Sequence, residues 1–140
     1  MLPRLADPRM RRASAALLGA YLLTLAIVAF WPTHVDRDAG PLLEAITRAL
    51  PWATYPRIEF TANVLLFVPF GMLVTVLVRQ WQLVLAVGFA ASLMIEFVQE
   101  VALPGRTASI LDVLANTIGI GIGAGLAALA ARRATRPATA

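Results

Sequence analysis

The chain has 140 residues, of which 59% are hydrophobic and only 14% are charged, and its formal net charge is +4. Soluble domains have a charged share of roughly 25%, so this composition excludes an ordinary soluble fold and indicates a membrane protein. The chain has no cysteine, which excludes disulfides, thiolate metal sites and a cysteine nucleophile. Every basic residue is an arginine near the end of an apolar run, and these arginines form no stripe, so we expect no nucleic-acid partner.

Four apolar stretches are long enough to cross a hydrocarbon core of about 30 Å as helices. They cover residues 14–31, 61–78, 82–101 and 110–131. The first follows several arginines and resembles a secretory signal, but its apolar run reaches Trp31 without a small-residue cleavage site and three further spans follow. We therefore expect a single all-α membrane domain over residues 1–140, built as a bundle of four transmembrane helices.

The loop over residues 32–60 contains a pattern typical of a short amphipathic helix. Its apolar residues recur at helical intervals between two prolines, and they are Leu42, Leu43, Ile46 and Leu50. With Trp31, Trp52 and Tyr55 nearby, this helix is expected to lie in the membrane interface, the alternative being an exposed loop. The only histidine, His34, lies in the same loop, and a lone histidine predicts neither a metal site nor a catalytic dyad.

The arginines predict the orientation, because basic residues in short loops and tails favour the cytoplasm. The set expected on the cytoplasmic side of the membrane is Arg4, Arg9, Arg11, Arg12, Arg79, Arg132, Arg133 and Arg136. The set expected on the outer side is Arg37, Arg48, Arg57 and Arg106. Both termini are therefore expected in the cytoplasm, and residues 132–140 are expected to form a disordered basic tail.

Glycine and proline mark the expected packing of the last three spans, which short connections should hold side by side. Pro69, followed by Gly71, predicts a kink or break in the second span. Gly119 with Gly123, and Gly121 with Gly125, are small-residue pairs that let helices approach closely, and they offer a surface for a homo-oligomer.

Polar side chains gather in the half of the bundle that the arginines assign to the outside. Ser92, Glu96 and Gln99 share one helical face, with Glu100 at its margin, and Asp112 shares another face with Asn116. The remaining members of the predicted cluster are Asn63 near the start of the second span, Arg106 in the turn between the acidic helices, and Ser109 at the edge of the fourth span. Arg106 is the expected counter-charge for Glu96 or Asp112, and Asn63 and Asn116 are the expected donors to the other carboxylate. The alternative is structural: interhelical polar contacts that hold the bundle together, with Asp112 as a helix N-terminal residue.

The order of these residues resembles the signature of the VanZ-like family, small integral membrane proteins related to a teicoplanin-resistance protein. The residues that carry the resemblance are Asn63, Leu66, Phe67, Pro69, Gly71, Glu96, Gln99, Arg106, Asp112, Asn116 and Gly119. Two positions depart from the pattern: Ala62 stands where the family often has glycine, and Ser109 stands where many members have a further acidic residue. The resemblance implies a multi-pass protein of the bacterial cell membrane with an influence on teicoplanin susceptibility.

Several functions fit these residues, none of which requires a cofactor. The first is a non-enzymatic module that binds a lipid head group or a lipid-linked cell-wall precursor, with Arg106 meeting a phosphate. The second is an intramembrane enzyme with Glu96 and Asp112 as acid and base, although the sequence offers no convincing nucleophile. The third is a subunit of a transporter or flippase, and the last is a scaffold whose polar cluster serves only folding.

Overall fold

The computed structural model describes residues 8–30, 40–78, 80–103 and 107–134, which form helices joined by short turns, without a strand. The helices in chain order are α1 (Pro8–Ala29), α2 (Gly40–Ala49), α3 (Tyr55–Val78), α4 (Trp81–Ala102) and α5 (Ile110–Ala134). All except α2 are long and apolar enough to cross a membrane. The predicted all-α fold with four spans and a short helix in the first loop is therefore confirmed. Three residues named above, Trp31, His34 and Arg37, lie outside the described residues.

Two spans are longer than their apolar runs. α3 begins at Tyr55 instead of residue 61, because Arg57 and Glu59 interrupt the apolar run without ending the helix. Its 24 residues give a length of about 36 Å, which exceeds a hydrocarbon core of roughly 30 Å and leaves room for polar first turns. α5 continues to Ala134, so the predicted disordered tail is wrong for its first three residues, which are helical.

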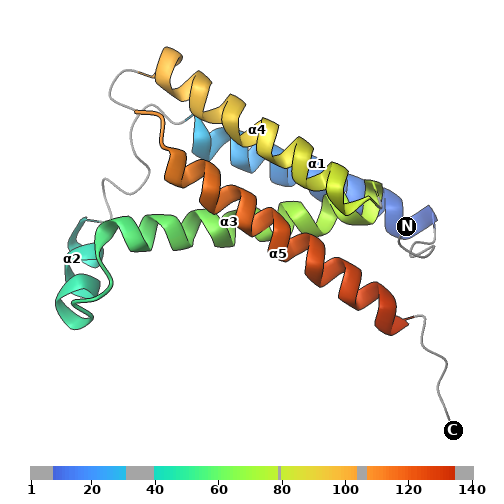
Figure 1. Ribbon diagram of the computed structural model, residues 1–140, viewed down its shortest axis with the longest axis horizontal. Helices are drawn as coiled ribbons and strands as arrows, with labels where there is room; N and C mark the ends of the chain where they lie inside the picture. The colour runs from blue at the N-terminus through green and yellow to red at the C-terminus, as the bar shows by residue number, and fades with distance from the viewer. Residues whose placement is uncertain (1–7, 31–39, 79, 104–106, 135–140) are drawn as a thin grey trace, which may run out of the picture.

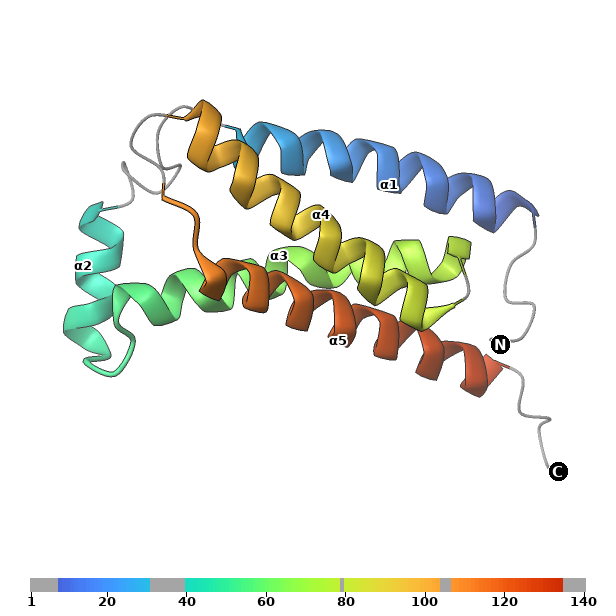
Figure 2. The same ribbon diagram turned by 45° about the horizontal axis from the view of Figure 1, so that its top comes forward.

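The four long helices lie alongside one another, as Figures 1 and 2 show. α3 and α5 begin at the same end of the bundle, where α1 and α4 finish, and α2 lies across this end beside the start of α3. We call this end, which carries the first turns of α3 and α5 and the last turns of α1 and α4, the polar end. The first turns of α1 and the last turns of α5 both lie at the opposite end (Figure 1).

The most extensive helix contact joins α3 and α5, although α4 separates them in the sequence. The two helices run parallel and meet at Gly71, Gly119 and Gly123, where an added Cβ would overlap backbone atoms of the facing helix. The backbone carbonyls that it would meet are those of Ile120, Val64 and Val68, respectively. Only glycine permits backbones to approach this closely, so these residues fix the register of α3 against α5.

Ile120 is the centre of the apolar core, with no exposed surface. Its backbone lies against Gly71 of α3, and its side chain lies against Gly88 of α4, so one residue of α5 contacts both neighbouring helices. Phe67 and Phe70 of α3 belong to the same core, with ring centroids 6.1 Å apart. α1 adds Leu25 to this core and packs mainly on α3.

The glycines of α5 divide between two surfaces. Gly119 and Gly123 contact α3 within one chain, so this pair does not form a surface for a second copy. Gly121 has a side-chain atom of Leu85 3.6 Å from the position of an added Cβ, whereas Gly125 would meet nothing within 4 Å among the described residues. An oligomer through α5 remains a prediction, and it would have to use the face of Gly125.

The helix α3 is continuous through Pro69, so of the predicted kink or break the break is wrong, and the kink stays a prediction. Proline lacks the N–H that would bond to the carbonyl four residues earlier, but the rest of the helix continues on both sides. One turn beyond Gly71, the hydroxyl of Thr75 donates to the Gly71 carbonyl at 2.7 Å. A buried polar side chain inside this span is thus satisfied by its own helix.

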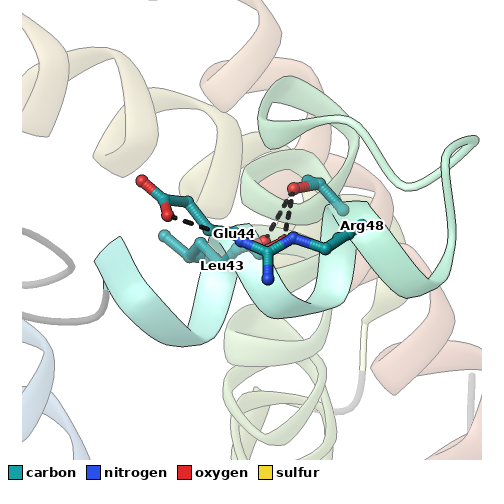
Figure 3. A network of polar contacts seen from close by, with 4 residues as sticks. Leu43, Glu44 and Arg48 are labelled. Atoms are coloured by element: carbon teal, nitrogen blue, oxygen red, sulfur yellow. Dashed lines mark hydrogen bonds and ion pairs between the residues drawn. The ribbon is translucent and has the colours of Figure 1, made fainter.

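The short helix α2 has its polar side chains in contact with each other and with its own backbone, as Figure 3 shows. Arg48 lies 4.0 Å from Glu44, and the Thr47 hydroxyl donates to the carbonyls of Leu43 and Glu44 at 3.0 and 3.1 Å. This exposed ion pair contributes little stability, on the order of a few tenths of a kcal/mol. Of the predicted apolar face, Leu43 and Ile46 are partly buried, whereas Leu42 and Leu50 are exposed.

The close approach of α3 and α5 makes one prediction about stability. Gly123→Val should lower the free energy of unfolding by about 1–3 kcal/mol or more, because the added atoms would strike the backbone of α3. Gly125→Val is the matched control on the same helix, since its added atoms meet open space. Unfolding of the purified protein in mixed micelles with increasing dodecyl sulfate would measure both variants. Equal losses in the two variants would contradict a glycine-dependent α3–α5 contact.

Candidate functional site

Toward the polar end, the inward face of α4 is polar and its outward face is apolar, the reverse of a helix in a soluble protein. Ser92, Glu96 and Gln99 are buried, with 0%, 7% and 8% of their surface exposed. Large apolar side chains of the same helix are exposed, including Met94 and Phe97. In a lipid environment an apolar surface faces outward at no cost, whereas a carboxylate or amide is directed into the bundle.

A cavity of about 510 Å³ lies at the polar end, between α1, α3, α4 and the start of α5. Its polar lining residues are Tyr55, Glu59, Asn63, Glu96, Gln99, Thr107, Ser109, Asp112 and Asn116. Its apolar lining residues are Leu25, Val28, Ala29, Leu43, Ile58, Ala62, Leu66, Phe67 and Ile95. The cavity therefore combines three carboxylates, three amides and three hydroxyls with an apolar wall, a combination that suits an amphiphilic ligand.

Two hydrogen bonds between side chains connect the helices around this cavity. The Asn63 amide of α3 donates to Asp112 Oδ1 of α5 at 2.9 Å. The Asn116 amide of α5 donates to the Ser92 hydroxyl of α4 at 2.9 Å. Asn63 is thus a donor to a carboxylate, as predicted, whereas the described bond of Asn116 goes to a serine. The other polar atom of Asn116, Oδ1, is buried and has no hydrogen-bond partner among the described residues.

The start of α5 is held by two carboxylates of α4. Glu96 Oε2 accepts from the Ser109 amide at 2.7 Å, and Glu100 Oε2 accepts from the Ala108 amide at 2.6 Å. Ser109 acts as the N-cap, because its hydroxyl oxygen accepts from the Asp112 amide at 3.3 Å. Negative charge is favourable at a helix N-terminus, so this arrangement stabilises α5 and orients Glu96 at the same time. Glu100, the predicted margin of the cluster, is exposed and does not line the cavity.

The end of α1 is joined to α4 by a single described side-chain hydrogen bond. Gln99 Nε2 donates to the carbonyl oxygen of Ala29 at 2.8 Å. Ala29 is the last residue of α1, where helix carbonyls have no partner further along the helix. Gln99 therefore holds the end of α1 in place as a wall of the cavity.

The predicted cluster is brought together in part. Asn63, Glu96, Gln99, Asp112 and Asn116 all line one cavity. Arg106, the predicted counter-charge, lies outside the described residues. The packing residues Gly71, Gly119 and Gly123 lie at the α3–α5 contact farther along the bundle, whereas Pro69 is exposed.

The cavity lining also includes three polar residues that the sequence did not assign to the site, Glu59, Tyr55 and Thr107. Glu59 lies four residues before Asn63, one helical turn away on the same face of α3. The apolar run begins after Glu59, so hydropathy alone does not assign this residue to the site, and the signal that would find it is this turn-by-turn spacing. With Glu59 the cavity has three carboxylates, although Ser109 replaces the additional acidic residue that many family members are expected to have.

The described groups do not form a recognisable catalytic or metal-binding arrangement. No three carboxylate or imidazole side chains among the described residues are grouped so that they could hold a metal ion. The hydroxyl of Ser92 is hydrogen-bonded to the Asn116 amide, which is not a base.

The family model described as VanZ/LLP1 matches residues 18–131. The match runs from the middle of α1 to near the end of α5 and includes every described residue that lines the cavity. The chain belongs to the VanZ/LLP1 family. Neither a curated protein nor a solved structure matches it. Family membership and the four apolar helices together make this a multi-pass membrane protein.

The hydrogen bond between Asn63 of α3 and Asp112 of α5 can be tested by exchanging the two residues. Asn63→Asp should destabilise the protein, because it places a second carboxylate 2.9 Å from Asp112 and removes the donor. Adding Asp112→Asn should restore most of the loss, since the amide then donates in the opposite direction. We expect a coupling of about 0.5–2 kcal/mol in unfolding experiments, the range of interhelical hydrogen bonds in membranes. A double variant no more stable than Asn63→Asp would contradict a direct bond.

Proposed function

We propose that this VanZ/LLP1 chain binds the head group of a membrane lipid or of a lipid-linked cell-wall component at the outer face of the bacterial cell membrane. The observation that carries the proposal is the cavity of about 510 Å³ lined by polar side chains from α3, α4 and the start of α5. By occupying or positioning such an envelope component, the protein would influence susceptibility to glycopeptides such as teicoplanin.

The distribution of the lining residues suits an amphiphile. Glu59 and Asn63 occupy the first turns of α3, and Phe67 follows one turn, about 6 Å, farther into the bundle. α1 contributes only apolar side chains, among them Leu25 and Val28. A polar head group would meet hydrogen-bonding groups near the end of the bundle, while its adjoining hydrocarbon would meet this apolar wall. The volume falls within the usual range for small-molecule sites, roughly 300–1,000 Å³.

The arginines support an outward-facing cavity. Arg9, Arg11 and Arg12 lie in the first turns of α1, and Arg132 and Arg133 lie in the last turn of α5. These parts of the chain share the end of the bundle opposite the cavity (Figure 1). Because arginine-rich ends remain in the cytoplasm, the cavity would face the outside and both termini would be cytoplasmic.

The orientation can be tested directly, because the chain has no native cysteine. Thr54→Cys, an exposed position beside the start of α3, should react in intact cells with a membrane-impermeant maleimide. Ala134→Cys, an exposed position at the end of α5, should react only after the membrane is permeabilised. The reverse pattern would contradict an outer-face cavity.

The role of the cavity can be tested in a glycopeptide-sensitive Gram-positive host. Expression of the wild-type chain should lower teicoplanin susceptibility, and Glu96→Gln or Asp112→Asn should abolish the effect by removing a charge that contacts the ligand. Gly125→Ala is the matched control outside the cavity and should behave as the wild type. The measurements are the minimal inhibitory concentration and the membrane abundance of each variant.

The outcomes separate the two parts of the proposal. Loss of the effect in variants of normal abundance supports the cavity as the site of action. An abundant wild-type chain that leaves teicoplanin susceptibility unchanged would contradict the glycopeptide role but not head-group binding. Head-group binding is tested on its own by titrating the purified protein with short-chain phospholipids and with a water-soluble analogue of a lipid-linked cell-wall precursor, and the absence of saturable binding to any of them would overturn it.

A further inference from the structure

Among the four long helices, α1 is the least firmly held. Ser14 and Leu25 are its only buried side chains among those described, whereas α5 is buried at every turn from Val113 to Ala131. Its glycine brings no other helix close, because a Cβ added at Gly19 would meet nothing within 4 Å among the described residues. A segment with few buried contacts moves at a lower free-energy cost than the core beside it.

At the polar end α1 and α4 lie beside each other without an extensive contact. Among the described residues, the helix pairs in extensive contact are α3 with α5, α4 with α5, α1 with α3 and α3 with α4. The one described side-chain hydrogen bond from α1 to α4 joins the Ala29 carbonyl to Gln99 Nε2 at 2.8 Å. Tyr21 packs on the core, but its hydroxyl has no hydrogen-bond partner within the described part of the chain. The polar link between α1 and α4 is therefore a single bond between neutral groups.

Apolar surface runs from the cavity between α1 and α4 to the outside of the bundle. Val28 and Ala29 of α1 and Ile95 of α4 line the cavity and are only partly buried. Their neighbours in the sequence, Ile27 and Met94, are 52% and 60% exposed, on faces that contact lipid when the helices span a membrane. The polar lining residues come from α3, α4 and the segment that leads into α5. A molecule with its polar head in the cavity would thus find an apolar path for its hydrocarbon between α1 and α4.

We propose that α1 is a lateral gate of the cavity, an inference that rests on the proposed head-group binding. The last turns of α1 move away from α4, and a diacyl lipid enters from the membrane with its chains between the two helices. Loss of the Gln99–Ala29 bond opens the gate, while α3, α4 and α5 stay packed around Ile120. The alternative is a soluble head group that enters from the water past α2, whose Leu43 also borders the cavity.

Movement of α1 is tested by distances between spin labels in the full chain, which has no native cysteine. The labels are attached at two exposed positions, Ile27→Cys on α1 and Phe97→Cys on α4. The protein is held in nanodiscs of phosphatidylethanolamine and phosphatidylglycerol, where pulsed electron paramagnetic resonance should resolve two α1–α4 distances. Gln99→Leu should raise the ratio of the longer to the shorter distance about threefold, the effect of an average interhelical hydrogen bond. Gln99→Met replaces Gln99→Leu if the latter does not fold.

Two controls accompany the distance measurement. Thr24→Val removes a hydrogen bond that α1 makes to its own Ala20 carbonyl, so this variant should leave the ratio unchanged. Labels at Phe97→Cys and Leu114→Cys report on α4 and α5, and their distance should not respond to Gln99→Leu. A single α1–α4 distance that is the same in the wild type and in Gln99→Leu would overturn the gate. An equal change in the α4–α5 distance would overturn it as well, because the whole bundle would then have moved.

Entry of a lipid is tested by joining the two helices. Ala29→Cys and Gln99→Cys, at positions that are hydrogen-bonded in the wild type, are bridged by a short bifunctional methanethiosulfonate that a thiol removes again. The full chain is titrated with dihexanoyl phosphatidylglycerol and with glycerophosphoglycerol, the same head group without chains. The bridge should weaken lipid binding at least about tenfold, the loss expected when about two methylene groups are no longer buried. Reduction should restore lipid binding, and the chainless head group should bind equally in both forms.

The results distinguish the gate from head-group binding. Equal lipid binding in the bridged and reduced forms would overturn passage of the chains between α1 and α4 and leave head-group binding intact. Equal affinity of the wild type for the lipid and for glycerophosphoglycerol would overturn entry from the membrane in favour of entry from the water. If dihexanoyl phosphatidylglycerol does not bind saturably, the role of α1 in lipid entry is overturned whatever the distances show. Head-group binding itself is then decided by the other lipids and the precursor analogue.

Discussion

The close contact between α3 and α5 is the constraint on which the rest of the structure depends. Gly119 and Gly123 leave no atoms between the two backbones, so α3 and α5 can meet in only one register. That register brings Asn63 to within 2.9 Å of Asp112 at the polar end. It also lets Ile120 contact Gly71 on one side and Gly88 on the other, so that α4 is positioned by the same few residues. The glycine contact and the polar cavity therefore lie at two positions along the same pair of helices, α3 and α5.

The membrane environment explains why the polar residues converge. Lipid does not drive apolar side chains inward, so the interior of the bundle is open to small and polar residues. The second half of α4 follows this logic, with Ser92, Glu96 and Gln99 buried and large apolar side chains such as Met94 and Phe97 exposed. Each of the three has a described hydrogen-bond partner on another part of the chain: the Asn116 amide, the Ser109 amide and the Ala29 carbonyl. These bonds offset the burial of polar groups and also leave their side chains around a common cavity.

The cavity connects the family assignment to a physical role. The VanZ/LLP1 match covers every described residue of its lining, from Leu25 to Asn116. An acidic and amide-rich end over an apolar wall is suited to hold the head group of an amphiphile, and the described residues contain no group of carboxylate or imidazole side chains that could hold a metal ion. The same residues that hold the helices together thus define what the proposed site would select.

The sequence by itself determined the fold class and most of the polar set. Apolar runs of sufficient length predicted the four spans, because only helices satisfy their own backbone in lipid. Helical spacing placed Glu96 with Gln99 and Asp112 with Asn116, since a period of 3.6 residues puts them on common faces. Hydropathy failed at Glu59, because a helix can continue through charged residues that end an apolar run. It failed again at Arg132 and Arg133, which were expected in a tail and lie in the last turn of α5.

Only the tertiary structure decided which groups meet. The sequence could not tell that α3 packs most extensively on α5 and not on its neighbour α4, because that choice depends on backbone approach at glycines far apart in the chain. For the same reason it could not assign Asn63 to Asp112, Asn116 to Ser92, or Gln99 to the end of α1. A pattern of residues specifies the face of each helix, whereas the rotation and register between helices follow from packing of the whole bundle. The cavity, which no single helix contains, is a property of that packing.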